Sequence, residues 1–331
     1  MIVSGSDSQA ILAAAARIQA GELVGFPTET VYGLGADASS DRAVAGIFAA
    51  KGRPSDHPLI VHLADRAQVS DYASSVPPFA ERLMAAFWPG PLTVILPRQA
   101  GMAAAAAGGQ NSIGLRCPNH PVALRFLKAC LVLGVSGVAG PSANRFGRVS
   151  PTIAAHVAQE FGDDLRVLDG GPCEVGIESS IVDCTRSRPV LLRPGVLTRA
   201  QLEAACGEPV LAKDELPSEA GSTPRASGTL DAHYAPNAKV RLMDTGAIQT
   251  ALDLLGADAA HIAVYARDML RIKSEKVVFR RMPDDALATA QQLFAVLRGF
   301  DDQGVRLIWI ENPPASPEWD GVRDRLGRAA A

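Results

Sequence analysis

Short β-rich runs alternate with helical patterns over the first two hundred residues, and this alternation constrains the fold more than any other feature. Runs rich in β-branched and apolar residues occur at 22–26, 58–63, 92–97, 112–116, 135–139, 165–168, 180–184 and 189–193. Helical periodicity occurs at 9–20, 41–51, 79–87, 119–131, 151–160 and 198–205. Such alternation predicts an α/β domain.

A second and smaller α/β unit is predicted near the end of the chain. Its strand-like segments VRLMD, HIAVYA, KVVFR and VRLIWIE alternate with helical patterns at 246–255, 285–299 and 318–329. Before it, periodicity disappears into a segment rich in Pro, Ser, Gly and Ala. A structureless stretch of about 30 residues is usually functional or a linker. We therefore expect a first domain over 1–206, a linker over 207–237 and a second domain over 238–331.

Composition favours a cytosolic enzyme. The 331 residues are 47% hydrophobic and 20% charged, near globular averages and enough for two domains. A net charge of −3 argues against a protein that coats nucleic acid. The five cysteines are odd in number and never spaced as Cys-x-x-Cys, so reduced thiols in the cytoplasm fit best. The longest apolar run, 129–141, is interrupted by glycines and too short for a bilayer, so no membrane association is expected.

A hydroxyl-rich turn follows the buried β-rich run at 22–26, which ends before Pro27. In FPTETVYGLG, Thr28 and Thr30 can present side-chain oxygens and backbone amides to a ligand. Ligands of α/β sheets bind at strand ends. This turn is therefore a candidate binding site.

Two cations follow at the end of the next helical pattern. Lys51 and Arg53 flank Gly52, which can end the helix. Cations in a last helical turn also complement the helix dipole without any ligand. From the residues alone, both interpretations stay open.

Three familiar motifs do not account for function here. GLGADA at 33–38 matches the dinucleotide fingerprint formally, but five residues separate Pro27 from Gly33, so the required strand-turn-helix context is missing. The sequence contains neither G-x-x-x-x-G-K-[ST] nor G-x-S-x-G. No histidine pair has metal-binding spacing on one helical face, so no protein-built metal site is expected.

Eight motifs between 26 and 195 together resemble the threonylcarbamoyl-AMP synthase family, the YrdC-like enzymes. In order, they are FPTETVYGLG, KGRP, HPLIVH, WPGPLT, GLRCPNHP, GPSAN, GIESSIVD and LLRPG. The resemblance implies a twisted mixed sheet with helices and a large concave cleft, followed by a smaller Rossmann-like α/β domain. It also implies an enzyme, a nucleotidyltransferase.

The family condenses L-threonine, bicarbonate or CO2, and ATP into threonylcarbamoyl-AMP and releases pyrophosphate. The resemblance therefore implies ATP as a substrate accompanied by Mg2+, with no tightly bound organic cofactor. The product passes to a separate transferase complex, which modifies the adenosine next to the anticodon of certain tRNAs. The adenylation step itself does not require tRNA.

The family's site residues carry over by motif. The catalytic and triphosphate contacts are Lys51, Arg53, Ser142 and Asn144. Further ATP contacts are Ser55, Arg193 and Tyr234. The threonine pocket comprises Thr28, His62, Arg116 and Ser179.

Several of these positions also have ordinary structural explanations. GPSAN alone can be a Ser/Asn turn, and Arg193 alone can be a solvated charge at a sheet edge. His62 alternates with apolar neighbours on a strand, which a structural histidine would also do. Ser55 and Cys117 lie beside matched contacts, and their residue types point to backbone roles at most.

The segment SGTLDAHYAPN resembles the linker motif P-G-x-x-x-x-H-Y-A-P of the long, two-domain form of the family. Ser227 replaces the leading proline, whereas Gly228, His233 and Tyr234 match. The resemblance implies that this linker folds back over the active site.

Two other classes of function stay open. A cationic cleft would also attract RNA, although only 5% of the residues are aromatic, which leaves few stacking platforms. YrdC-like domains also occur in hydrogenase-maturation proteins, so a carbamoyltransferase acting on another acceptor is the second alternative. Those proteins carry acylphosphatase-like and zinc-finger segments that this sequence does not show.

Overall fold

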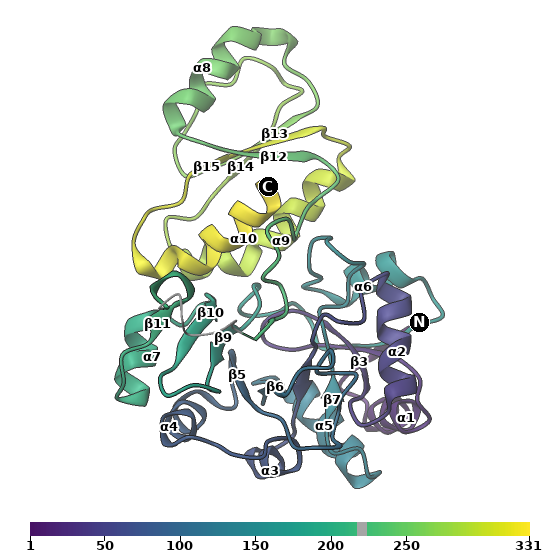
Figure 1. Ribbon diagram of the computed structural model, residues 1–331. Coiled ribbons are helices and arrows are strands. Elements are labelled where there is room, and N and C mark those ends of the chain that lie inside the picture. Colours follow the sequence, from purple (N-terminus) through teal and green to yellow (C-terminus); the bar gives the residue numbers. More distant parts are fainter. Residues whose placement is uncertain (217–223) are drawn as a thin grey trace. The chain divides into compact units, whose positions relative to one another are not determined.

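The chain divides into two compact units (Figure 1). The structure, a computed structural model, describes residues 1–216 and 224–331. The first unit contains Met1–Phe146 and Ser150–Thr229, and the second contains Gly147–Val149 and Leu230–Ala331. The predicted linker is thus shared between the units, and its residues 217–223 lie outside the described residues.

An eleven-stranded mixed sheet forms the framework of the first unit, in the order β1-β8-β2-β3-β7-β4-β6-β5-β9-β10-β11. Its strands are β1 (Ile2–Ser4), β2 (Val24–Phe26), β3 (Gly33–Asp37), β4 (Ile60–His62), β5 (Leu92–Pro97), β6 (Ser112–Arg116), β7 (Val138–Ala139), β8 (Arg166–Asp169), β9 (Ser180–Asp183), β10 (Val190–Arg193) and β11 (Leu211–Ala212). Parallel pairs such as β4–β6 and antiparallel pairs such as β5–β6 both occur. The predicted mixed α/β sheet is confirmed.

Helices flank this sheet. They are α1 (Ser8–Gln19), α2 (Asp41–Lys51), α3 (Val69–Tyr72), α4 (Pro78–Phe87), α5 (Pro121–Val132), α6 (Ala154–Phe161) and α7 (Arg199–Cys206), with 3-10 turns η1 (Arg66–Gln68) and η2 (Lys213–Glu215). The Ser40 side chain caps the start of α2 by accepting from the amide of Ala43. Gly52 ends the same helix in the left-handed conformation, φ 64°, which costs glycine little. This end fixes Lys51 in the last turn.

Apolar side chains fill several cores of the first unit, of which two are the largest. One contains Ile18 of α1 and Phe126 of α5, packed with Phe26 of β2. The other joins α2 and α4 to the central strands through residues such as Ile47 and Leu83. Burial of this apolar surface stabilises the sheet on which the site residues are carried.

Strand β3 was not predicted, because glycines interrupt its pattern. A Cβ atom on Gly33 would lie 2.8 Å from the Phe26 ring, and one on Gly35 would lie 3.1 Å from it. Because neither glycine has a side chain, the Phe26 ring of β2 can pack against β3. The segment is a strand that pairs with β2 and β7, not a turn that opens a helix. The short elements β1, β11 and α3 were likewise missed.

The second unit is a four-stranded, wholly parallel sheet in the order β12-β15-β13-β14. Its strands are β12 (Lys239–Met243), β13 (Ile262–Ala266), β14 (Val278–Arg281) and β15 (Leu307–Glu311). Its helices are α8 (Thr245–Leu255), α9 (Ala286–Asp302) and α10 (Asp320–Ala330), with 3-10 turns η3 (Gly256–Asp258) and η4 (Pro317–Trp319). Parallel strands joined by helices confirm the smaller Rossmann-like domain.

Candidate active site

Five neighbouring strands of the large sheet begin or end at one edge and bring polar side chains into a row. His62 and Arg116 are register partners at the carboxyl ends of β4 and β6. Thr93 lies near the start of the neighbouring strand β5. Ser179 immediately precedes β9, and Arg193 ends β10. The strand order β4-β6-β5-β9-β10 therefore aligns five residues that are far apart in the sequence.

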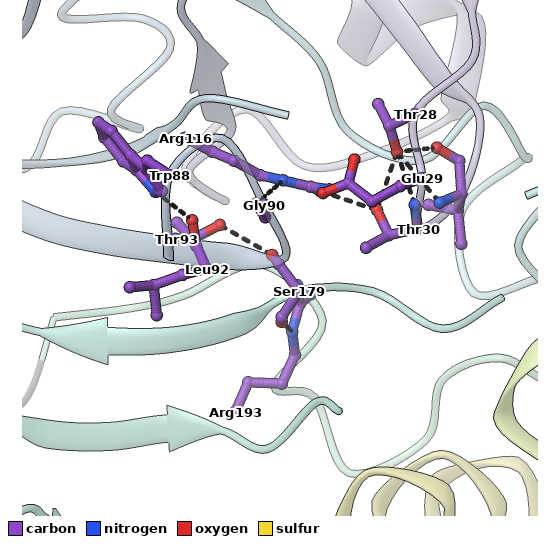
Figure 2. Close-up of polar contacts among 11 residues, drawn as sticks. Thr28, Glu29, Thr30, Trp88, Gly90, Leu92, Thr93, Arg116, Ser179 and Arg193 are labelled. Atoms are coloured by element: carbon purple, nitrogen blue, oxygen red, sulfur yellow. Dashed lines mark hydrogen bonds and ion pairs between the residues drawn. The ribbon is translucent and has the colours of Figure 1, made fainter. Parts of the chain in front are cut away.

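The turn after β2 contributes hydroxyls to this row (Figure 2). The hydroxyls of Thr28 and Thr30 lie 2.9 Å apart, and Thr28 Oγ1 donates to the carbonyl of Val31. Arg116 Nη1 donates to Thr30 Oγ1 at 2.8 Å, and Arg116 Nη2 lies 2.7 Å from Glu29 Oε1. Both side chains of the Arg116–Glu29 pair are 4% exposed. A buried guanidinium thus faces a cluster of hydroxyls.

His62 lies beside this cluster and is uncharged at neutral pH. Burial and the positive charge of Arg116 lower the pKa of its imidazole to about 3. Its ring meets that of Phe26 edge-on at 5.4 Å between centroids. Within the described residues, its Nδ1 atom has no hydrogen-bond partner. A neutral imidazole with an available nitrogen can contact a polar substrate group.

Ser179 links the hydroxyl side of the row to Arg193. Its hydroxyl lies 2.8 Å from the hydroxyl of Thr93, and its carbonyl accepts from Arg193 Nε at 3.1 Å and Nη2 at 2.9 Å. Arg193 is 2% exposed. It is therefore an anchored, buried cation and not the solvated edge charge that its sequence position also allowed.

Lys51 extends from the end of α2 to the GPSAN loop. Its ammonium donates to the main-chain carbonyls of Ser142, at 2.6 Å, and of Asn144. Burial, and secondly the charge of Arg53, lower the pKa of Lys51 well below its ordinary value. The helix end and the loop are thereby held together, ninety-one residues apart in the chain.

Arg53 and the last part of the linker meet in the same unit. Arg53 Nη2 donates to the carbonyl of Pro58 at 3.0 Å and to Ser227 Oγ at 3.4 Å. The carbonyl of Ser227 also accepts from Arg193 Nη1 at 2.8 Å. A pocket lies between the segment 225–227 and the sheet, with apolar residues of the sheet at its floor: Ile60, Ile95 and Ile181.

The remaining predicted residues lie elsewhere. Ser55 is exposed in the loop after α2. Cys117 is buried, which raises the pKa of its thiol to about 11 and leaves it a poor nucleophile. Tyr234 belongs to the second unit, where its ring stacks on Phe294 at 5.5 Å and lies under the guanidinium of Arg325. Its nucleotide contact stays a prediction.

Two residues of the candidate site were not predicted. Glu29 lies in FPTET between the two threonines that were singled out, and Thr93 lies in WPGPLT, one of the eight motifs. An ionisable residue inside a strand-ending hydroxyl turn was the available signal for Glu29. Thr93 carried no signal, because its role depends on the pairing of β5 with β6 and β9.

The described residues were also searched for metal sites and membrane spans. Within residues 1–216 and 224–331, no three His, Cys, Asp or Glu side chains come together as a metal site. In the same part of the chain, no helix is both long and apolar enough to cross a bilayer.

Comparisons with known proteins identify the family of the chain. The Sua5/YciO/YrdC family model, described as telomere recombination, matches residues 16–195. The model described as threonylcarbamoyl-AMP synthase, C-terminal domain, matches residues 197–331. The threonylcarbamoyl-AMP synthase of Bacillus subtilis (strain 168) is 37% identical and aligns with 99% of this chain and 94% of its own.

Solved structures give the same result. A crystal structure of Sua5 from Pyrococcus abyssi complexed with L-threonine matches with a TM-score of 0.87 and 35% identity, covering 98% of this chain and 95% of its own. In a variant of that protein, a histidine and the tyrosine after it are replaced by alanine. Its structure matches with a TM-score of 0.89 and 34% identity, and the match covers 100% of this chain and 96% of the variant's chain.

The fold and these matches define a YrdC-like enzyme. The chain belongs to the Sua5/YciO/YrdC family. Within it, the second domain assigns the chain to the long, two-domain form, an enzyme of the nucleotidyltransferase type.

Proposed function

We propose that this enzyme makes L-threonylcarbamoyl-AMP from L-threonine, bicarbonate or CO2, and ATP, with release of pyrophosphate. The observation that carries the proposal is the row of strand ends that aligns the buried Arg116 with the hydroxyls of Thr93 and Ser179 and with Arg193. A guanidinium suits an α-carboxylate, and hydroxyls suit the other polar groups of an amino acid. Of its relatives, the protein from Pyrococcus abyssi was solved with L-threonine.

We propose that Lys51, Arg53 and Arg193 hold the triphosphate of ATP. All three are at least nine-tenths buried, and main-chain carbonyls hold each of them in place. Arginine can grip phosphate oxygens with two donors, whereas lysine acts as a point charge. Mg2+ would enter with ATP as part of that substrate.

The reaction needs no covalent nucleophile from the protein. The threonine amine captures CO2 as a carbamate, and a carbamate oxygen then displaces pyrophosphate at the α-phosphorus. Positioning of the two substrates and neutralisation of phosphate charge would supply the rate acceleration. Exclusion of water would protect the carbamate and the mixed anhydride. Ser142, Asn144, Ser55 and Tyr234 remain proposed ATP contacts, and Thr28 and His62 remain proposed threonine contacts.

The product would serve a tRNA threonylcarbamoyl transferase complex that modifies the adenosine next to the anticodon. The adenylation itself would proceed without tRNA. We place the enzyme in the cytoplasm, in keeping with its five cysteines, none of which forms a disulfide.

Omission of single substrates tests the proposal. Pyrophosphate release from ATP is expected only when threonine and bicarbonate are both present. Equal release with serine or without any amino acid would contradict the threonine assignment and leave carbamoyl transfer to another acceptor. Tight, salt-sensitive RNA binding without this activity would favour the RNA-binding alternative.

A further inference from the structure

Glu29 is a buried carboxylate that pairs with Arg116 through one oxygen and leaves the other, Oε2, without a donor among the described residues. It is 3% exposed and lies between Thr28 and Thr30 in the turn after β2. Oε1 lies 2.7 Å from Arg116 Nη2, and Oε2 accepts no hydrogen bond from residues 1–216 or 224–331. Because a buried carboxylate oxygen without a donor is costly, a donor from a ligand is expected at Oε2.

Arg116 makes the matching half of this arrangement. Its Nε donates to the carbonyl of Gly90 at 3.3 Å, and its Nη1 donates to Thr30 Oγ1. The guanidinium is therefore held in place by Gly90, Thr30 and Glu29. A guanidinium has five donors, so these contacts leave others for a substrate carboxylate.

The charges of Arg116 and Glu29 are complementary to the two charges of an amino acid in water. An α-amino acid has one carboxylate and one ammonium, attached to the same carbon. If its carboxylate binds Arg116, its ammonium comes within reach of the carboxylate beside Arg116. Each of the four buried charges then has an opposite neighbour, which removes the penalty of burying them singly.

We infer that Glu29 binds the ammonium of the amino-acid substrate and takes the proton that carbamate formation releases. The inference rests on the proposed function. Threonine ammonium and bicarbonate give carbamate, water and one proton. One ammonium proton passes first to Glu29, whose carboxylate becomes a neutral carboxyl group until solvent removes the proton, and this step frees the nitrogen lone pair. The lone pair forms the C–N bond as a hydroxide leaves the bicarbonate carbon, and a second proton from the nitrogen completes that hydroxide to water.

Other ionisable groups near this carboxylate are less suited to the task. Arg116 forms an ion pair with Glu29, and the negative charge of Glu29 acts on Cys117 after β6, on His120 before α5 and on Cys173 after β8. His62 is held neutral with a pKa of about 3, which makes its imidazole a weak base. Burial raises the pKa of both thiols, so that each holds its own proton.

The test compares Glu29→Gln with the wild-type chain in the forward and reverse directions. At about pH 7.5, the variant should form threonylcarbamoyl-AMP about 100-fold more slowly or worse, the usual cost of losing a general base. Its rate should recover roughly tenfold for each added pH unit, as more threonine is free amine. Conversion of threonylcarbamoyl-AMP and pyrophosphate to ATP should stay near the wild-type rate, because no ammonium is deprotonated in that step.

The matched control is Glu22→Gln, which removes a carboxylate from an exposed ion pair with Arg17. It should leave both directions unchanged. A Glu29→Gln enzyme slowed equally in both directions, or slowed without recovery at high pH, would show that Glu29 only holds Arg116 and would overturn the inference. Unchanged forward activity would also overturn it.

Two further outcomes stay distinguishable. A wild-type enzyme that makes no threonylcarbamoyl-AMP removes the proposed function itself. If Glu29→Gln does not fold, Glu29→Asp retains the charge but moves it back by one methylene. The inference then predicts a slower forward reaction with a near-normal reverse reaction, and equal losses contradict it.

Discussion

Arg193 donates a hydrogen bond from Nη1 to the main-chain carbonyl of Ser227, thirty-four positions later, at 2.8 Å. The hydroxyl of the same serine accepts from Arg53 at 3.4 Å. Two cations proposed to hold phosphate are thus already in contact with Ser227 of the linker. Phosphate oxygens of ATP would have to replace these contacts or share the donors with them.

Gln110 is expected to control how firmly the part of the linker around Arg225 is held. Its amide accepts from the main-chain nitrogen of Arg225 at 2.8 Å and donates to the carbonyl of the same residue at 3.2 Å. Gln110→Ala removes both hydrogen bonds, at about 1 kcal/mol each. Tryptic cleavage after Arg225 should accelerate about 5- to 30-fold. Gln99→Ala, at an exposed glutamine, is the control; equal cleavage in the two variants would contradict the anchoring role.

Removal of the cations at the end of α2 should abolish most of the turnover. Lys51→Ala and Arg53→Ala are each expected to lower the rate about 100-fold or more, because each removes electrostatic stabilisation of the reacting phosphates. Steady-state pyrophosphate release measures the effect, and circular dichroism checks the fold. Lys213→Ala, at an exposed lysine, should keep the wild-type rate. Normal turnover in the first two variants would refute the assignment of these cations.

His62 should make the protein sensitive to acid. Its pKa is about 3 in the folded state, against about 6.5 in an unfolded chain. Between these values the unfolded state binds a proton that the folded state does not. The free energy of unfolding should therefore fall as pH drops through this window, by at most about 1.4 kcal/mol per pH unit from this group. Stability from this residue is complete above about pH 6.5.

Urea denaturation at about pH 4.5 and pH 6.5 measures this difference. His62→Gln should lose less stability on acidification than the wild type does. His261→Asn replaces an exposed histidine with positive φ by a residue that tolerates it, and should behave as the wild type. Identical acid sensitivity of His62→Gln and the wild type would count against the pKa shift.

The glycines of β3 should be required for packing. Gly33→Ala places a methyl group 2.8 Å from the Phe26 ring, and such overpacking costs about 1 to 3 kcal/mol. Gly46→Ala, inside α2, is a control with the opposite expected effect on stability. The nearest side-chain atom to its methyl group would be on Leu23, at 3.6 Å. Gly46→Ala should stabilise by about 0.5 to 1 kcal/mol. Chemical denaturation compares them, and equal stabilities would show that the ring is free to move away.

The sequence predicted the parts of this fold that depend on local patterns. The end of α2 at Lys51 was predicted correctly, because Gly52 favours a helix end in any context. Strand β3 was missed because its glycines are explained by side chains of other strands, Phe26 of β2 and Val138 of β7. Contacts such as Lys51 with the Ser142 carbonyl span ninety-one residues and leave no local pattern. The candidate site residues were selected from the order of the eight motifs and not from residue spacing.

The position of Glu29 beside Arg116 marks the limit of that prediction. Its place in FPTET was visible in the sequence, but its pairing with the end of β6 depends on the order of strands in the sheet. Register and strand order are set by packing of the whole domain, which single-residue patterns do not encode.

The most direct test of the account is mass spectrometry of the product formed from ATP, L-threonine and 13C-labelled bicarbonate. The account predicts one nucleotide product with the mass of threonylcarbamoyl-AMP, made heavier by the single labelled carbon, and an equal amount of pyrophosphate. A product without the label, or pyrophosphate release without a threonine-containing nucleotide, would contradict it.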